Sequence, residues 1–490
     1  MTHAPHPPFD NSYARLPESF YTRQHPQPVP APELIRVNHS LADYLGFDPA
    51  WLESETGVGF IAGNYIPGDA DPVATVYAGH QFGGWVPQLG DGRAILLGEV
   101  IARDGVRHDI QLKGSGRTPY SRAGDGRAPL GPVLREYIVS EAMAALGVPT
   151  TRALGAVTTG QFVVREDRLP GAVLARVAQS HIRIGTFQYF ASKQDIDALQ
   201  TLVDHVIERH YPRAAGANEP LQAMLAGVVE RQASLVAQWQ LLGFIHGVMN
   251  TDNMLLSGET VDYGPCAFMD GFDNNAVFSS IDHAGRYAYR NQVQIAHWNL
   301  AQLVQALLPL LDDDQERAVG KGQAVIDEFP GLVQAAYRNG IFRKLGLAGD
   351  ESGDVALVQD LLELMQQHGS DFTLTFRRLA ELAGTDENTG EIFQLDAAFE
   401  PWLERWRSRF AESEDAATRT SGMLRANPVF IPRNHLVEEA IVAAENDGDF
   451  APFHALVDVL AHPFDYDANL ERYARPPLPG QEVRQTFCGT

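Results

Sequence analysis

The hydrophobic pattern of the chain changes near residue 180, and this change limits the fold more than any other feature. Before it, AILLGEVIA and VRHDIQLK alternate like two strands around a tight turn at Asp104 and Gly105, and ALGAVTT and AVLARVA are two further strand candidates. After it, segments 195–211, 221–244 and 297–311 carry apolar residues at helical spacing. The sequence therefore predicts an α+β protein with a sheet-rich first lobe, a helical second lobe and a ligand-binding cleft between them.

Other segments add detail to this division. PVLREYIVSEAMAALG predicts a helix with Pro132 near its start and Gly147 just past its end, and this helix carries Glu136. Residues 1–32 are rich in Pro and His, so we expect an extended arm on the surface. HLVEEAIVAAEN predicts a helix after residue 410, a region to which the sequence assigns no chemistry.

The composition argues against several classes of protein. The 490 residues carry a net charge of -24, whereas a nucleic-acid-binding surface must neutralise phosphates with Lys and Arg. No apolar run reaches the roughly 18 residues of a membrane span, and the start MTHAPHPPFDNSYARLP lacks the regions of a signal peptide. Two cysteines fit a reducing compartment. We therefore expect a cytoplasmic protein with neither a nucleic-acid nor a membrane partner.

Glycine-rich segments offer phosphate contacts. The pentapeptide GDGRA occurs at 90–94 and at 124–128, where successive N–H groups beside Arg93 and Arg127 can surround phosphate oxygens. Each copy taken alone is more typical of a tight turn, but the convergence of both copies with Lys113 favours a phosphate site. Lys113, one of only four lysines among 38 basic residues, ends a predicted strand just before a Gly-rich loop. A compact ammonium there suits a point contact with phosphate, although neither segment is a Walker loop or a Rossmann fingerprint.

The stretch HGVMNTDNMLLSGETVDYG, residues 246–264, resembles the active-site segment of a protein kinase. His246 and Asn253 have the spacing of the kinase catalytic loop, and Asp262 begins Asp-Tyr-Gly where kinases have Asp-Phe-Gly. We expect a hairpin turning at Ser257 and Gly258 to bring Asn253 and Asp262 side by side. Their oxygens suit a Mg²⁺ that also binds the phosphates of ATP, whereas His246 is expected to shape the loop.

One position departs from the kinase pattern. The residue two after the His is an Asp in protein kinases and receives the substrate proton, but here it is Val248. Either catalysis has been lost, or the base has moved to Asp252, next to Asn253. A displaced base suits a nucleotide bound in another orientation, so the attacked phosphorus need not be the γ one.

Five motifs in order, YAGHQFGGWVPQLGDGRA, QLKGSGRTPYSR, GDGRA, HGVMNTDNM and DYGPCAFMD, closely resemble the selenoprotein O (SelO, YdiU) family over nearly the whole chain. The resemblance implies a protein-kinase-like two-lobed fold and protein adenylyltransferase activity. In this family ATP binds flipped relative to ordinary kinases, and AMP is transferred to Ser, Thr or Tyr hydroxyls of proteins with release of pyrophosphate. On this basis we expect an N-terminal extension at 1–70, an N-lobe at 71–185, a C-lobe at 186–410 and a C-terminal extension at 411–490.

The resemblance also implies roles for individual residues. Asp252 is implied as proton acceptor, and Asn253 and Asp262 as Mg²⁺ ligands, with replacement by Mn²⁺ or use of another nucleotide left open. Glu136 is implied to pair with and orient Lys113. Arg176 and Arg183 are implied to hold phosphates, although the sequence alone would place them between the lobes or on the surface. The implied nucleotide site is completed by Gly90, Gly92, Arg93, Lys113, Asp125, Gly126 and Asp262.

The C-terminal tail and the overall activity leave alternatives. Family members carry a Cys or selenocysteine near the C-terminus, and Cys488 in QTFCGT occupies that place, so the chain as written is not a selenoprotein. We hypothesise that Cys488 pairs with Cys266 or with a thiol on another protein, the alternative being an unpaired tail thiol. Two other functions stay open, namely phosphoryl transfer to a protein or small molecule and nucleotide binding without catalysis.

Overall fold

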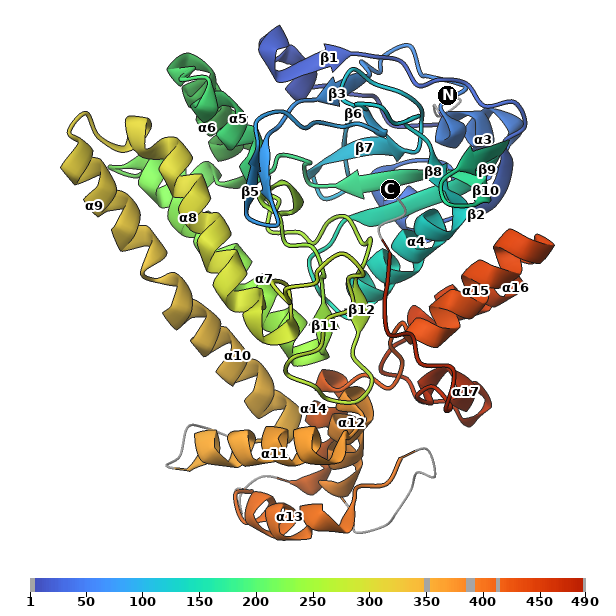
Figure 1. Cartoon of the computed structure of the whole chain (residues 1–490), viewed down its shortest axis with the longest axis vertical. Coiled ribbons are helices and arrows are strands. Elements are labelled where there is room, and N and C mark those ends of the chain that lie inside the picture. The colour runs from blue at the N-terminus through green and yellow to red at the C-terminus, as the bar shows by residue number, and fades with distance from the viewer. Residues whose placement is uncertain (1–4, 348–352, 385–392, 411–414, 488–490) are drawn as a thin grey trace.

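The computed structural model describes residues 5–347, 353–384, 393–410 and 415–487. Its N-terminal half contains an antiparallel sheet and its C-terminal half is mostly helical, so the predicted α+β class is confirmed (Figure 1). Within the described residues, we find no helix with both the length and the apolar content that a membrane crossing requires.

The main sheet has eight strands, in the order β1-β3-β6-β7-β10-β9-β2, with the short β8 paired to β10. The four strands predicted between residues 94 and 178 are all present, and the β6–β7 pair turns at Asp104 and Gly105 as expected. Lys113 is the last residue of β7. The strands are β1 (Tyr21–Arg23), β2 (Glu33–Val37), β3 (Val73–Thr75), β6 (Ala94–Ile101), β7 (Arg107–Lys113), β8 (Ala128–Pro129), β9 (Arg152–Val164) and β10 (Arg168–Ala178).

The predicted long helix is α4 (Leu130–Ala145), which packs on β9 and β10 with one face. Its other side is covered by α15 and α16 from the far end of the chain, as Figure 1 shows. Glu136 lies in the second turn of α4 and is buried. Because α4 is held from both sides, it presents Glu136 at a fixed position to the inner strands β7 and β10.

The N-terminal arm differs from the prediction. Residues 1–32 were expected to lie on the surface, but β1 joins the main sheet through β3, and Tyr13 and Phe20 are buried in the hydrophobic core. The Pro-rich composition correctly predicts a segment without α-helix, but it does not indicate that Tyr13 and Phe20 are buried.

Most of the remaining chain is helical. Figure 1 shows α9 and α10 following one another along one flank, beside α8 and α7, with α11 to α14 below them. The helices are α1 (His39–Leu45), α2 (Pro49–Leu52), α3 (Glu55–Ala62), α5 (Ile184–Ser192), α6 (Ile196–His210), α7 (Pro220–Leu242), α8 (Gln292–Leu311), α9 (Gln315–Ile326), α10 (Phe329–Leu345), α11 (Asp354–His368), α12 (Phe372–Leu382), α13 (Glu400–Arg407), α14 (Ala416–Ala426), α15 (Asn434–Asp447), α16 (Ala451–Leu460) and α17 (Glu471–Ala474).

Two small strand pairs lie outside the main sheet. They are β4 (Gly79–Gln81) with β5 (Gly84–Val86), and β11 (Phe244–Ile245) with β12 (Ala267–Phe268). The predicted hairpin at 254–263 is wrong in part. The chain does turn there, with the Gly258 N–H donating to Leu255 at 3.1 Å, but Leu255 pairs with Arg183 and Thr260 pairs with Thr150. The two arms of the turn therefore bind separate segments of the protein instead of each other.

Candidate functional site

A cavity of about 670 Å³ lies between the main sheet and the loops that follow β11. Its walls come from both halves of the chain, and every site residue predicted from the sequence lines it. Those residues are Gly90, Gly92, Arg93, Lys113, Asp125, Gly126, Glu136, Arg176, Arg183, Asp252, Asn253 and Asp262. The structure thus brings the set together, while the chemical role of each member stays a prediction.

A buried ion cluster forms the inner wall of this cavity. The Lys113 ammonium donates to Glu136 and, at 3.1 Å, to Asp262. Arg176 donates to Glu136 at 3.0 Å and to Asp262 at 2.6 Å. Arg183 donates to the other oxygen of Asp262 at 2.9 Å. Three cations therefore converge on two carboxylates, and Asp262 is the one that all three share.

The cluster fixes the ionisation of its carboxylates. Burial alone would raise the pKa of Asp262, but Arg176, Lys113 and Arg183 hold that pKa well below its ordinary value. Burial likewise opposes ionisation of Glu136, and Lys113 and Arg176 lower its pKa. Both side chains are therefore carboxylates at neutral pH, and the cluster carries one net positive charge.

The backbone at Asp262 supports a special role for this residue. Its φ is 62°, in the left-handed region that residues other than glycine seldom adopt. Such a conformation costs free energy and persists only where surrounding contacts impose it. At Asp262 three cations hold the carboxylate, and the backbone carbonyl accepts from the N–H of Gly264 at 2.8 Å.

Asp252 has a different environment from Asp262. It is 7% exposed, its Oδ2 accepts from Gln81 Nε2 at 3.3 Å, and its Oδ1 is buried without a hydrogen-bond partner among the described residues. Burial raises the pKa of Asp252 to about 6, against a smaller opposing effect of Arg183. A buried carboxylate with one unsatisfied oxygen is equipped to accept a proton.

The β4–β5 hairpin, which sequence reasoning did not place in the site, holds the loop that carries Asp252. The N–H of His80 donates to Thr251 Oγ1 at 2.8 Å, and the N–H of Phe82 donates to Asn250 Oδ1 at 3.0 Å. These contacts place Gln81 against Asp252. No local pattern could have indicated them, because about 170 residues separate the partners; only the family motif YAGHQFGGW pointed to this segment.

The two GDGRA segments serve different purposes. Asp91 in the first is buried and accepts from the N–H and the hydroxyl of Thr75, so it holds the loop together. Asp125 in the second pairs with Arg165 at 3.0 Å near the cavity mouth. Gly126 has φ 71°, and a Cβ there would lie 2.1 Å from a carbonyl oxygen. The second segment therefore needs glycine to bring its backbone to the cavity.

Arg127 and His246 also have defined partners. The Arg127 guanidinium donates to the carbonyls of Gln27 and Pro28, which ties the Gly-rich loop to the N-terminal arm. His246 is fully buried, and its Nε2 lies 2.9 Å from the Val261 carbonyl oxygen. This contact supports the expectation that His246 shapes the loop.

The donor set allows a test of whether Mg²⁺ fits. Asn253 donates through Nδ2 to the Val248 carbonyl at 2.8 Å, which leaves its Oδ1 without a protein hydrogen-bond donor among the described residues. The donor set consists of this amide oxygen and the carboxylates of Asp252 and Asp262, and all three residues line the cavity. They are the hard oxygen donors that Mg²⁺ prefers, so the residues present fit a magnesium ion.

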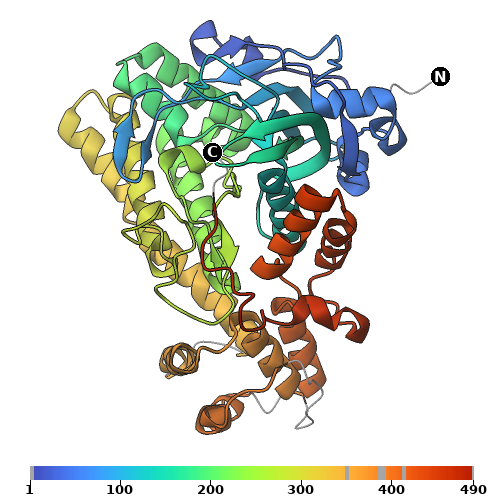
Figure 2. The ribbon, with the colours of Figure 1, turned by 45° about the vertical axis from the view of Figure 1, so that its right-hand side comes forward.

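The C-terminal tail returns to the segment after Asp-Tyr-Gly, and Figure 2 shows it rising from α17 toward the sheet. Thr486 donates through its N–H to Phe278 at 2.7 Å and through its hydroxyl to Pro265 at 2.7 Å. Cys266 is buried beside Pro265. Cys488 lies outside the described residues, so its pairing with Cys266 stays a prediction.

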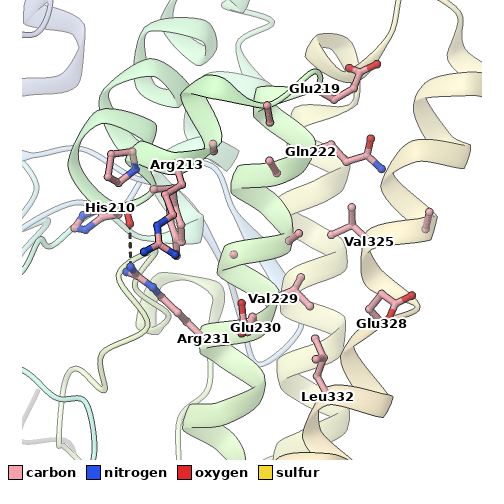
Figure 3. Close-up of a pocket in the computed structure, with 18 of the residues that line it drawn as sticks. His210, Arg213, Glu219, Gln222, Val229, Glu230, Arg231, Val325, Glu328 and Leu332 are labelled. Atoms are coloured by element: carbon pink, nitrogen blue, oxygen red, sulfur yellow. Dashed lines mark hydrogen bonds between the residues drawn. The ribbon is translucent and has the colours of Figure 1, made fainter.

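A larger cavity, of about 1130 Å³, lies elsewhere, between α7 and the α9–α10 flank (Figure 3). It is lined by His210, Arg213 and Arg231 together with Glu219, Glu230 and Glu328. None of the site residues predicted from the sequence lies there, so size alone does not identify the functional site.

Comparison with known proteins agrees with the geometry. Residues 6–461 match the family described as "Protein adenylyltransferase SelO". The chain is 59% identical over 489 residues to "Protein nucleotidyltransferase YdiU" of Bradyrhizobium diazoefficiens, with 99% of both chains covered. A protein of the same name from Rhodopseudomonas palustris (strain BisB18) is 58% identical over 490 residues, covering 99% of this chain and all of that one. On these grounds, the chain belongs to the SelO family of protein adenylyltransferases.

Proposed function

We propose that this protein transfers AMP from ATP to Ser, Thr or Tyr hydroxyls of other proteins, with Asp252 as the base. The observation that carries the proposal is that the proton acceptor of kinases is absent, while another buried carboxylate lies in the same cavity. Val248 stands where a kinase has its proton acceptor, and its apolar side chain is buried. Asp252 supplies a buried carboxylate with an unsatisfied oxygen at another point of the same cavity.

The cations of the cluster would bind the phosphates of ATP. Lys113, Arg176 and Arg183 share Asp262 in this structure, and the phosphates offer them a larger anionic charge. The Gly90–Gly92 and Gly126 segments would approach the same phosphates through their backbone. A nucleotide flipped relative to kinases would turn its α phosphorus toward Asp252, which is why we propose AMP transfer.

The reaction balances with the residues present. The hydroxyl oxygen of the protein substrate attacks the α phosphorus as its proton passes to the Asp252 carboxylate. The bond from the α phosphorus to the bridging oxygen breaks, and pyrophosphate leaves with that electron pair. Arg176, Arg183 and Lys113 offset the charge that develops on the leaving group.

Asn253 and Asp262 would hold the metal ion in this proposal. When bound, Mg²⁺ supplies Lewis-acid charge stabilisation to the phosphates of ATP. Asp262 can turn toward the ion once its cations engage those phosphates. The Asn253–Val248 hydrogen bond keeps the amide oxygen directed away from the loop backbone.

The proposal extends to the architecture. We assign a protein-kinase-like arrangement with the N-lobe at 71–185 and the C-lobe at 186–410, flanked by extensions at 1–70 and 411–490. The Lys113–Glu136 pair between β7 and α4 supports it, because protein kinases use the same strand-to-helix ion pair. Cytoplasmic localisation is part of the same proposal.

A split-label assay tests the activity. Purified protein is incubated with Mg²⁺ and ATP labelled either at the α or at the γ phosphorus, and label on protein is measured. We expect transfer from the α position only. Transfer from the γ position only would make this protein a kinase and would refute the proposed orientation of the nucleotide.

A matched pair of variants separates catalysis from binding. Asp252→Ala should abolish labelling while ATP binding persists, because the base is lost and the phosphate-binding cations stay. Asp204→Ala, on the exposed face of α6, serves as the control and should keep full activity. Unchanged labelling by the Asp252 variant would refute its assignment as base.

A further inference from the structure

A third cavity, of about 870 Å³, lies where the C-terminal ends of α4, α7 and α10 meet the side of α14. Leu146 and Gly147 follow α4, Leu241 and Leu242 end α7, and Gly346 caps α10. This cavity shares no lining residue with the catalytic one. It is therefore a separate site on the same molecule.

The charges around this cavity are all of one sign. Four of the described lining residues are cationic, namely Arg343, Lys344, Arg419 and Arg425, and no described lining residue is Asp or Glu. The whole chain, in contrast, has 62 acidic and 38 basic residues. The charged residues among the described lining of this cavity are thus all cationic, although the protein as a whole is acidic. Such a surface favours an anionic ligand.

Lys344 is the most unusual member of the set. It is 4% exposed, and its ammonium has no carboxylate or hydrogen-bond acceptor among the described residues. Its Nζ lies over the face of Phe376, 4.4 Å from the ring centroid, and over that of Phe372, 5.9 Å from the ring centroid. Burial lowers the pKa of Lys344 to about 7. A buried lysine is ordinarily paired with an acidic group, whereas Lys344 has no such partner among the described residues.

Helix dipoles alone do not explain these cations. Each helix C-terminus carries about half a negative charge, so three ends contribute roughly one and a half, which is less than the charge of the cationic side chains. The last carbonyls of α10 also have other donors. Asn427 Nδ2 donates to the Lys344 carbonyl at 2.8 Å, and Trp406 Nε1 donates to the Leu345 carbonyl at 2.9 Å.

We propose that this cavity binds a small phosphorylated organic molecule, whose phosphate lies among Arg343, Lys344 and Arg425. Arginine forks and a lysine ammonium are the side chains that hold phosphate in proteins. The apolar wall formed by Leu146, Leu241, Leu242, Met423 and Phe464 would contact the organic part. The volume lies within the range of small-molecule sites.

The position of the cavity links it to the catalytic one. The end of α7 leads directly into β11 and the loop at 246–253, and the end of α4 belongs to the helix that carries Glu136. A ligand between these ends touches both elements that shape the catalytic cavity. It is thus placed to regulate the enzyme without competing with ATP.

The test uses pyridoxal phosphate as the probe, because its aldehyde forms an imine with a lysine amine, with loss of water. Borohydride then reduces the imine, and mass spectrometry locates the modified lysine. The chain has only four lysines, Lys113, Lys193, Lys321 and Lys344, so each site is resolved. We expect labelling of Lys344 that saturating Mg²⁺-ATP does not prevent, whereas the same ATP should protect Lys113.

Two controls test the role of the phosphate. Pyridoxal, which lacks it, should label Lys344 at least about tenfold less, the effect of losing one charge-assisted contact. The double variant Arg343→Gln with Arg425→Gln should reduce labelling of Lys344 by pyridoxal phosphate about as much. Labelling of Lys193 should not change. The control double variant Arg103→Gln with Arg290→Gln, at exposed positions elsewhere, should label like wild type.

Three results would overturn the proposal. The first is no labelling of Lys344 by pyridoxal phosphate, which would mean that the cavity does not admit a phosphorylated molecule. The second is equal labelling by pyridoxal, and the third is full labelling in the Arg343 and Arg425 double variant. Either of these would show that the phosphate makes no contact there. None of the three depends on whether the protein transfers AMP.

Discussion

Replacing Asp252 with asparagine should abolish activity and at the same time make the ligand-free protein more stable at alkaline pH. The pKa of Asp252 is raised by burial from 3.8 to about 6 in the folded protein. In the unfolded chain this carboxyl ionises first, so folding becomes less favourable as pH rises from about 4 to about 6. Above about pH 6 the full cost is present, and below about pH 4 it is absent.

The size of the effect follows from the shift. At 1.36 kcal/mol for each unit of pKa, a shift of about two units corresponds to a cost of about 3 kcal/mol at pH 8. The asparagine side chain has nearly the same shape as that of Asp252, does not ionise, and its amide oxygen can still accept from Gln81. For 490 residues the unfolding entropy is about 1 kcal/mol per kelvin, so Tm at pH 8 should rise by about 3 °C.

Thermal unfolding of the metal-free and nucleotide-free protein in EDTA at pH 4 and at pH 8 measures this difference. The gain in Tm should be present at pH 8 and absent at pH 4, and the exposed control Asp204→Asn should show no gain at either pH. A variant that is no more stable than wild type at pH 8, or a gain that is equal at both pH values, would refute the argument that burial of the ionised carboxylate costs stability.

Three further predictions concern other parts of the structure. Gln81→Ala should lower kcat about tenfold or more with little change in KM for ATP, because one hydrogen bond that orients Asp252 is lost; steady-state transfer from α-labelled ATP measures this. Asp262→Ala should weaken Mg²⁺-ATP binding in calorimetric titration, and an unaltered affinity would contradict its role as metal ligand. Arg433→Met should lower the free energy of unfolding by about 3–5 kcal/mol, since Arg433 is fully buried between Asp270 and Asp371; denaturant titration would detect the loss.

Local patterns predicted the elements whose structure is decided locally. The β6–β7 hairpin follows from two alternating segments around Asp104 and Gly105, and α4 follows from helical spacing with a terminal glycine. These elements also fixed the positions of Lys113 and Glu136. The ion pair between these two residues, in contrast, was implied only by the family resemblance.

Long-range contacts account for what the sequence did not predict. The turn at Gly258 was foreseen, but Leu255 and Thr260 bond to Arg183 and Thr150, which are distant in the chain. The same holds for the burial of Tyr13 and for the contact of Gln81 with Asp252. Arg176 and Arg183 gave no local signal at all, and only the family resemblance assigned them. Pairing at such distances depends on how whole elements pack, and a single sequence does not state this.

The ion cluster answers a difficulty that the composition creates. A chain with a net charge of -24 repels ATP at long range, so the charge that attracts the phosphates must be local and shielded from solvent. Burying three cations without partners would be costly, and Asp262 and Glu136 reduce that cost before the nucleotide arrives. Under the proposed function, Asp262 would leave these cations to hold the metal ion when the phosphates of ATP take its place. The strained backbone at Asp262 is consistent with a residue whose position is imposed by its partners and can change with them.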